Sequence, residues 1–185
     1  MAYDLSTVSI IVADQSKFMR KLLSEMLTGF GVGNIHLVDS GEKALKLFDE
    51  SDIDMVICDS LIEPVDGFEL TRTIRNNPDL PNRYLPIIFV TGHADMHSVI
   101  KARDAGATEF LVKPVAPAIL YERVVYVIEH QRPFIQAGQY FGPDRRRRVE
   151  AEYGGVEKRG APNAVDSKGV GLTQEEVEAI FKKRQ

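Results

Sequence analysis

Short apolar runs alternate with amphipathic stretches over the first 130 residues of the chain. The runs are rich in β-branched residues and have the composition of strands that are buried on both faces. They occupy residues 8–13, 35–38, 55–58, 87–90 and 110–112. After each run, apolar residues recur at helical spacing. The pattern therefore predicts five strand–helix units, which build a parallel sheet with right-handed crossovers and helices on both faces.

The apolar positions also predict which face each helix buries. Ser16 is placed to cap the first helix, which ends among the glycines at 29, 31 and 33. We expect the buried stripes to consist of Phe18, Leu22, Leu23, Met26 and Leu27 in the first helix, Ala44, Leu45, Leu47 and Phe48 in the second, Phe68, Leu70, Thr73 and Ile74 in the third, Val99, Ile100 and Ala102 in the fourth, and Ile119, Leu120, Val124, Val125, Val127 and Ile128 in the fifth.

The composition is that of a globular protein, since 44% of the 185 residues are hydrophobic and 27% are charged. A single cysteine excludes an internal disulfide and a metal site made of several thiolates, and a reducing compartment is the default. No apolar run approaches the roughly 20 residues of a membrane span. The start, MAYDLSTVSIIVADQ, lacks the basic region and the cleavage site of a signal peptide. We therefore expect a cytoplasmic protein.

The net charge of −4 divides unevenly along the chain. Residues 1–130 hold 12 Lys and Arg against 19 Asp and Glu, a balance of −7, whereas residues 131–185 hold 11 against 8, a balance of +3. Half of the 14 glycines also fall in this last part. We therefore divide the chain into an acidic body and a basic, Gly-rich extension.

Polar side chains stand at the carboxyl ends of the predicted strands, where ligands bind in parallel sheets. They are Asp14 and Gln15, Asp59, Thr91 followed by Gly92, and Lys113. Two carboxylates suit Mg²⁺, a lysine and a hydroxyl bind anionic oxygens, and Gly92 leaves space beside Asp59. The set suits a carboxylate that attacks a phosphoryl group. The alternative, that the carboxylates only cap helices and Lys113 is an exposed surface charge, accounts for single residues but not for the ordered set.

The motifs around these residues identify a known family. Residues 6–130, with IIVADQS, ICDSLIEPVDGFEL, PIIFVTG and AGATEFLVKP, resemble the receiver domain of CheY-like two-component response regulators. The resemblance implies a flavodoxin-like, doubly wound α/β fold, with a five-stranded parallel sheet and five helices. It also implies a phosphoacceptor rather than an enzyme. The implied roles are Asp59 as phosphoacceptor, Asp14, Asp59 and the Leu61 carbonyl as Mg²⁺ ligands, Thr91 as switch hydroxyl, Lys113 as phosphate-binding lysine, Phe110 as aromatic switch and Lys113-Pro114 as a cis peptide bond.

Two positions depart from the family pattern. Gln15 stands where the family has a second acidic residue. Its amide oxygen can coordinate a metal, but one negative charge is missing, so we predict weaker Mg²⁺ binding. In Ile62-Glu63-Pro64 an acidic residue takes the usual place of the proline, which moves by one position. Neither change removes the acceptor, although the first raises the alternative of a degenerate, non-phosphorylated scaffold.

The extension is expected to lack a core of its own. Residues 131–170 are Gly- and Arg-rich and predicted to be flexible, with three aromatics near their start that can pack on a partner or on the body. A DNA-binding domain is therefore not expected. The run Arg145, Arg146, Arg147 and Arg148 can bind phosphate groups. Arginine-rich extensions of some CheY-like proteins bind cyclic di-GMP, so a ligand-binding adaptor is an alternative function; a solvated charge run is the other interpretation.

Residues 171–185 are predicted to form a short amphipathic helix. Thr173 and Glu176 make a capping box. The apolar positions that we expect to bind a partner are Leu172, Val177, Ile180 and Phe181. The segment resembles the N-terminal peptide of the flagellar switch protein FliM, which binds CheY-like receivers. We therefore expect it to dock on the face made by helix four, strand five and helix five of its own or a neighbouring receiver; the alternative is a capped helix packed on its own body.

The sequence as a whole predicts a single-domain response regulator. A histidine kinase or phosphotransfer protein would phosphorylate Asp59, and the domain would signal through phosphorylation-dependent contacts to a downstream protein or a second copy of itself.

Overall fold

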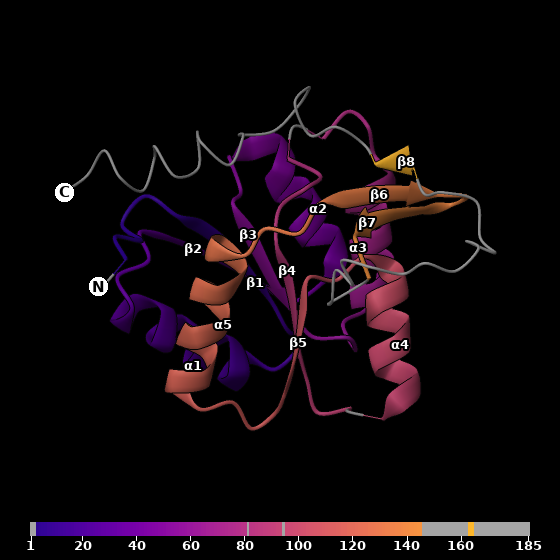
Figure 1. The fold of residues 1–185 in the computed structure, drawn as a ribbon. Helices are drawn as coiled ribbons and strands as arrows, with labels where there is room; N and C mark the ends of the chain where they lie inside the picture. The colour runs from indigo at the N-terminus through magenta and orange to yellow at the C-terminus, as the bar shows by residue number, and fades with distance from the viewer. Residues whose placement is uncertain (1–2, 81, 94, 146–162, 165–185) are drawn as a thin grey trace.

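A computed structural model of the chain describes residues 3–80, 82–93, 95–145 and 163–164. Its centre is a five-stranded parallel sheet in the order β2-β1-β3-β4-β5 (Figure 1). The strands are β1 (Ser9–Ala13), β2 (Asn34–Val38), β3 (Met55–Cys58), β4 (Ile87–Thr91) and β5 (Glu109–Val112). The helices are α1 (Lys17–Gly29), α2 (Gly41–Glu50), α3 (Gly67–Asn76), α4 (Met96–Ala105) and α5 (Pro117–Glu129). The predicted architecture is confirmed.

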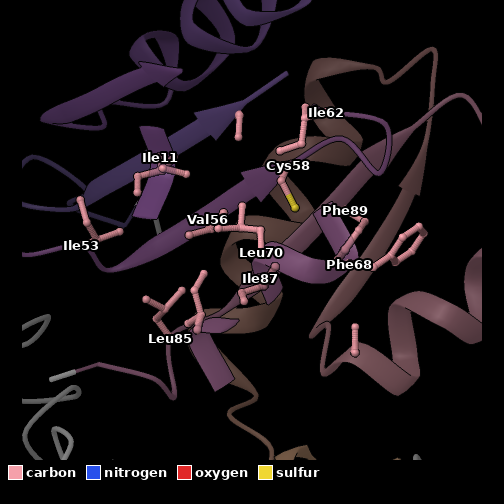
Figure 2. Close-up of a cluster of buried hydrophobic side chains, with 14 of the residues drawn as sticks. Ile11, Ile53, Val56, Cys58, Ile62, Phe68, Leu70, Leu85, Ile87 and Phe89 are labelled. Atoms are coloured by element: carbon pink, nitrogen blue, oxygen red, sulfur yellow. The ribbon is translucent and has the colours of Figure 1, made fainter. Parts of the chain in front are cut away.

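The two faces of the sheet are buried under separate groups of helices. Residues of β1, β3 and β4 alternate between the faces, as the two-residue period of a strand requires. Ile11, Val56 and Phe89 belong to the core under α2, α3 and α4, which Figure 2 shows. Their neighbours Ile10 and Ile57 belong to the core under α1 and α5. Because these strands are buried on both faces, nearly every residue in them is apolar.

Polar side chains mark where four of the helices begin. Ser16 accepts a hydrogen bond from the Met19 N–H and caps α1, as predicted. Equivalent bonds to Ser40, Asp66 and Asp95 cap α2, α3 and α4. Each cap accepts a hydrogen bond from a backbone N–H that the first turn leaves without a partner, and so determines the residue at which the helix begins.

Several predicted helix stripes differ from the structure at individual positions. Phe18 is 72% exposed, because it lies in the first turn of α1, beyond the end of the strands. In α3, Thr73 is exposed and Thr71 is buried in its place; the Thr71 hydroxyl donates to the Gly67 carbonyl at 2.7 Å, which satisfies it away from water. The remaining predicted core positions that are exposed are Val99, Ile100 and Ile119.

The extension does not leave the body after α5. Strands β6 (Phe134–Ala137) and β7 (Tyr140–Pro143) form an antiparallel hairpin, and β8 (Asn163–Ala164) pairs with β6. The hairpin lies against α3 and α4, beside the main sheet in Figure 1. Where the sequence predicted a flexible segment over 131–170, the structure therefore has an ordered second sheet in its described part.

Aromatic rings hold the hairpin on the body. Phe134 and Phe141 pack edge-on against Tyr84, with ring centroids 5.0 and 5.4 Å away. Arg75 of α3 is fully buried beneath them, with its guanidinium 5.1 Å from the Phe134 ring centroid. Its Nε donates to the Gly106 carbonyl at 3.0 Å. The aromatics of the extension thus pack on the body, one of the two partners that the sequence allowed.

Two glycines bring β7 against the end of α4. Gly106 ends α4 in the left-handed conformation, with φ of 103°, which favours glycine. A Cβ atom on Gly142 would lie 3.0 Å from the Gly106 Cα. Backbone therefore meets backbone at this contact, and the end of α4 is fixed to the hairpin.

The remaining tail predictions lie outside the described residues. They concern Arg146, Arg147 and Arg148 and the segment 171–185, with Leu172, Val177, Ile180 and Phe181. Within the described part of the chain, no helix combines the length and the apolar character that crossing a membrane requires.

Candidate functional site

Asp14, Asp59 and Lys113 meet at the carboxyl edge of the sheet, as the topology predicted. They follow directly after β1, β3 and β5. The Lys113 Nζ lies 2.6 Å from an oxygen of Asp14 and 2.5 Å from an oxygen of Asp59. The side chain of Lys113 is 17% exposed, that of Asp14 4% and that of Asp59 15%. One half-buried ammonium therefore holds two carboxylates together.

Asp14 is the more deeply buried of the two carboxylates. Its Oδ1 accepts the Ser16 N–H at 2.8 Å, so the side chain also closes the turn into α1. The Arg20 guanidinium donates to the backbone carbonyls of Asp14 and Gln15. Gln15 itself is exposed. Asp14 therefore closes the turn before α1, but Ser16 caps the helix itself, so helix capping does not account for this carboxylate.

Asp59 is held as a carboxylate. Burial by itself would raise the pKa of Asp59, but the hydrogen bond and charge of Lys113 and the Leu61 N–H, 3.2 Å from Oδ1, hold this pKa below its ordinary value. Burial by itself would lower the pKa of the Lys113 ammonium, but the hydrogen bonds and charges of Asp14 and Asp59 outweigh burial and raise this pKa above its ordinary value. The pair is therefore charged on both sides at neutral pH.

Two glycines at the carboxyl edge of the sheet, Gly67 and Gly92, differ in the space around them. A Cβ on Gly67, at the start of α3, would lie 2.3 Å from the Asp59 carbonyl oxygen. A Cβ on Gly92 would meet nothing within 4 Å. The first glycine lets α3 begin against the strand end, and the space around the second, next to Thr91, is open.

Thr91 lies at the end of β4 and is fully buried. Its Oγ1 is 2.7 Å from the Ser60 Oγ and accepts the His93 N–H at 3.2 Å. Ser60 is 2% exposed and also donates to Asp59 Oδ1 at 3.3 Å. Ser60 was not among the predicted site residues, because a serine next to a phosphoacceptor gives no pattern of its own.

Phe110 is half-buried in β5 and joins a row of rings. Its ring stacks at 6.4 Å on Phe89, which stacks in turn at 5.3 Å on Phe68. Phe110 therefore contributes to the core, and its incomplete burial leaves it one open side.

The predicted metal ligands are partly assembled. Asp14 and Asp59 lie together around Lys113. Leu61, whose backbone carbonyl is the third predicted ligand, is 53% exposed. Within the described ranges, no three His, Cys, Asp or Glu side chains are grouped so that they could hold a metal ion. The Lys113-Pro114 bond is cis, as the resemblance implied, and so is Glu63-Pro64, which was not predicted.

Exposed apolar side chains gather on α4, β5 and α5. The largest exposures are those of Met96 at 75% and Val112 at 48%; Val99, Ile100, Ile119 and Tyr126 are also exposed. Of the predicted arginine run, the structure describes Arg145, which pairs with Asp104 at 3.3 Å and stacks 3.8 Å over the Tyr140 ring. This arginine is engaged by the body.

Comparisons with known proteins agree with this geometry. The family model of the response regulator receiver domain matches residues 10–125. Chemotaxis protein CheY-3 of Vibrio cholerae is 29% identical over 122 residues, which cover 66% of this chain and 92% of that protein. A putative response regulator of Chloroflexus aurantiacus superposes with a TM-score of 0.62 at 29% identity, covering 66% of this chain and 98% of that one. The BeF3-activated DrrB receiver domain superposes with a TM-score of 0.57 at 29% identity, and the match covers 70% of this chain and 100% of that one.

Proposed function

The chain belongs to the response regulator receiver domain family, and on that premise we propose that Asp59 accepts a phosphoryl group from a histidine kinase or a phosphotransfer protein. The observation that carries the proposal is the position of Lys113 between the two carboxylates, 2.5 Å from Asp59 and 2.6 Å from Asp14. An ammonium fixed beside the nucleophile can neutralise the charge of incoming phosphoryl oxygens.

The reaction is a displacement at phosphorus. A carboxylate oxygen of Asp59 attacks the phosphorus atom of a phosphohistidine, the P–N bond breaks, and its electron pair stays on the imidazole of the donor protein. The product is an acyl phosphate on Asp59. The low pKa of Asp59, which Lys113 maintains against burial, keeps the attacking oxygen unprotonated. In this proposal the chain is the phosphoacceptor rather than an enzyme with a separate substrate.

The residues present suit a divalent cation with oxygen ligands. Receiver domains generally bind Mg²⁺ at this acidic pocket. Here Asp14 and Asp59 supply two carboxylates, and the Leu61 carbonyl would be a third ligand. When bound, the cation supplies positive charge for the phosphoryl oxygens. Because Gln15 replaces one carboxylate by a neutral amide, we propose that the affinity for Mg²⁺ is reduced.

Thr91 and Phe110 would transmit the phosphorylation to the surface. A phosphoryl group adds about two negative charges beside Thr91, whose hydroxyl can turn toward the new oxygens. Phe110 lies in β5, which pairs with β4, the strand that ends at Thr91. The helices on either side of β5 in the chain, α4 and α5, carry exposed apolar residues such as Met96 and Ile119. We propose that this face binds the downstream protein.

The proposed partner of this face within the chain is the segment 171–185. Its apolar positions Val177, Ile180 and Phe181 suit the exposed apolar side chains of α4 and α5. Deleting 171–185 should change the rate of phosphorylation or the oligomeric state measured by sedimentation; no change in either contradicts this docking.

The phosphoacceptor role is tested by intact-mass measurement after incubation with acetyl phosphate and Mg²⁺. Wild type should gain one phosphoryl group, and Asp59→Asn should gain none. Asp54→Asn is the matched control, because Asp54 binds the Ser9 N–H at the opposite edge of the sheet, and it should gain the group as wild type does. No gain in wild type would support a non-phosphorylated scaffold, and a gain that persists in Asp59→Asn would place the acceptor elsewhere.

A further inference from the structure

A line of hydrogen bonds joins the backbone of the loop after β4 to the carboxylate of Asp59. The His93 N–H donates to Thr91 Oγ1 at 3.2 Å. Thr91 Oγ1 and Ser60 Oγ are 2.7 Å apart, and Ser60 Oγ lies 3.3 Å from Asp59 Oδ1. Both hydroxyls are buried, Ser60 at 2% exposure and Thr91 at 0%, so water does not compete for their protons.

The two ends of the line fix its direction. A hydroxyl carries one proton, and an ionised carboxylate can only accept. The proton of Ser60 therefore points to Asp59. Ser60 then has no proton left for Thr91, so in the 2.7 Å contact between the two hydroxyls Thr91 is the donor and Ser60 the acceptor; a weaker hydrogen bond from Thr91 to Asp59 is the smallest of the contributions that lower the pKa of this carboxyl. Each hydroxyl donates once and accepts once, and the charge on Asp59 orients both.

Phosphorylation changes the group at the end of this line. An acyl phosphate has no carboxylate charge, and its strongest acceptors are the phosphoryl oxygens. The Thr91 proton can then be donated either to Ser60 or to the phosphoryl group, but not to both. Ser60 and the phosphoryl oxygens thus compete for one proton.

We propose that Ser60 is a positioning residue that holds the Thr91 hydroxyl in its unphosphorylated orientation, and that release of this bond is part of the response to phosphorylation at Asp59. This inference rests on the proposed function of Asp59 and adds a residue to it. Removing the Ser60 hydroxyl removes a bond of the unphosphorylated state alone, so it should favour the phosphoryl-bound state.

The experiment measures the concentration of beryllofluoride, a mimic of the phosphoryl group, that converts half of the protein at fixed Mg²⁺. The backbone amide signals of His93 and Leu61 report conversion, because they donate to Thr91 and Asp59. Ser60→Ala should lower the half-conversion concentration about fivefold, the value expected for one neutral hydrogen bond. It should also shift the His93 amide signal before any beryllofluoride is added.

The coupling to Thr91 separates positioning from a general effect on structure. In a Thr91→Val background, Ser60→Ala should leave the half-conversion concentration unchanged, whereas in a Thr91→Ser background, which keeps the hydroxyl, its effect should return. Ser9→Ala is the matched control, because Ser9 is a buried serine bonded to His36. It should behave as wild type.

The outcomes distinguish this inference from the function on which it rests. Phosphoryl gain by wild type from acetyl phosphate is measured first, and its absence overturns the proposed function. Equal half-conversion in wild type and Ser60→Ala, or an equal effect with and without the Thr91 hydroxyl, overturns the role of Ser60 alone. If Ser60→Ala does not fold, Ser60→Cys gives the same comparison, since a thiol is a weak donor and acceptor of similar size.

Discussion

Replacing Lys113 by methionine removes the cation between Asp14 and Asp59 and keeps the length of the side chain. Oxygens of both carboxylates lie within 2.6 Å of the Lys113 Nζ, so these two oxygens are at most about 5 Å apart. At that separation two unit charges repel by about 3 kcal/mol at an effective dielectric constant of 20 and by about 1 kcal/mol at 80. Because the site is only partly open to water, we expect Lys113→Met to lower the free energy of unfolding by about 2 kcal/mol at pH 7.

The pH dependence of this loss tests its electrostatic origin. In wild type the pKa of Asp59 lies below its ordinary value, so the stability it contributes is present above about pH 4 and is lost on acidification. In the variant, burial and the charge of Asp14 act without Lys113 and should raise this pKa. The difference between the two proteins should therefore be largest at neutral pH and shrink below about pH 4.

Urea unfolding of both proteins between pH 3.5 and pH 7 measures the loss. Lys43→Met is the control, because Lys43 pairs with Asp39 at 2.7 Å on the exposed surface, where such pairs contribute less than about 1 kcal/mol. Added Mg²⁺ should restore part of the stability of Lys113→Met by replacing the missing positive charge. A loss that is independent of pH, or no greater than that of Lys43→Met, would refute the reasoning.

Three further predictions concern the same edge of the sheet. Gly67→Ala places a methyl group 2.3 Å from the Asp59 carbonyl oxygen and should cost about 3 kcal/mol in urea unfolding; Gly29→Ala, with nothing within 4 Å, should not. Gln15→Asp adds a carboxylate and should tighten Mg²⁺ binding about tenfold by calorimetry; unchanged affinity would mean that this position does not face the cation. Burial, and then the charge of Asp59, raise the pKa of the Cys58 thiol, so a thiol reagent at pH 8 should react only at the rate of unfolding, and fast labelling of the native protein would contradict that.

The sheet could be predicted because burial on both faces leaves a strong signal in the sequence. The strands β1, β3 and β4 contain almost no polar residue before their last position, and the observed bounds differ from the predicted ones by at most one residue. The site followed from this assignment, since parallel strands bring Asp14, Asp59 and Lys113 to one edge in whatever order the sheet is built.

The hairpin and the helix faces depended on information that residue types alone do not carry. Gly138 and Gln139 form the two-residue loop between β6 and β7, a pattern typical of tight hairpins, but the strands on either side are four residues long. Arg75 is buried under this hairpin, although a charged residue is expected outside until its partners are known. Ser60 could not be assigned for a similar reason, because its role depends on the position of Thr91.

The contact between Gly106 and Gly142 holds only the C-terminal end of α4 against the hairpin. The helix is 10 residues long, which corresponds to about 15 Å. Its last turn is fixed to the hairpin at Gly106, and its first turn, with Met96, lies beside the loop that follows Thr91. A rotation of about 10° at the fixed end moves the other end by about 2.5 Å and the last turn by less than about 1 Å. Any rotation of α4 about this contact would therefore displace most the exposed apolar end that carries Met96, where a binding partner would detect it.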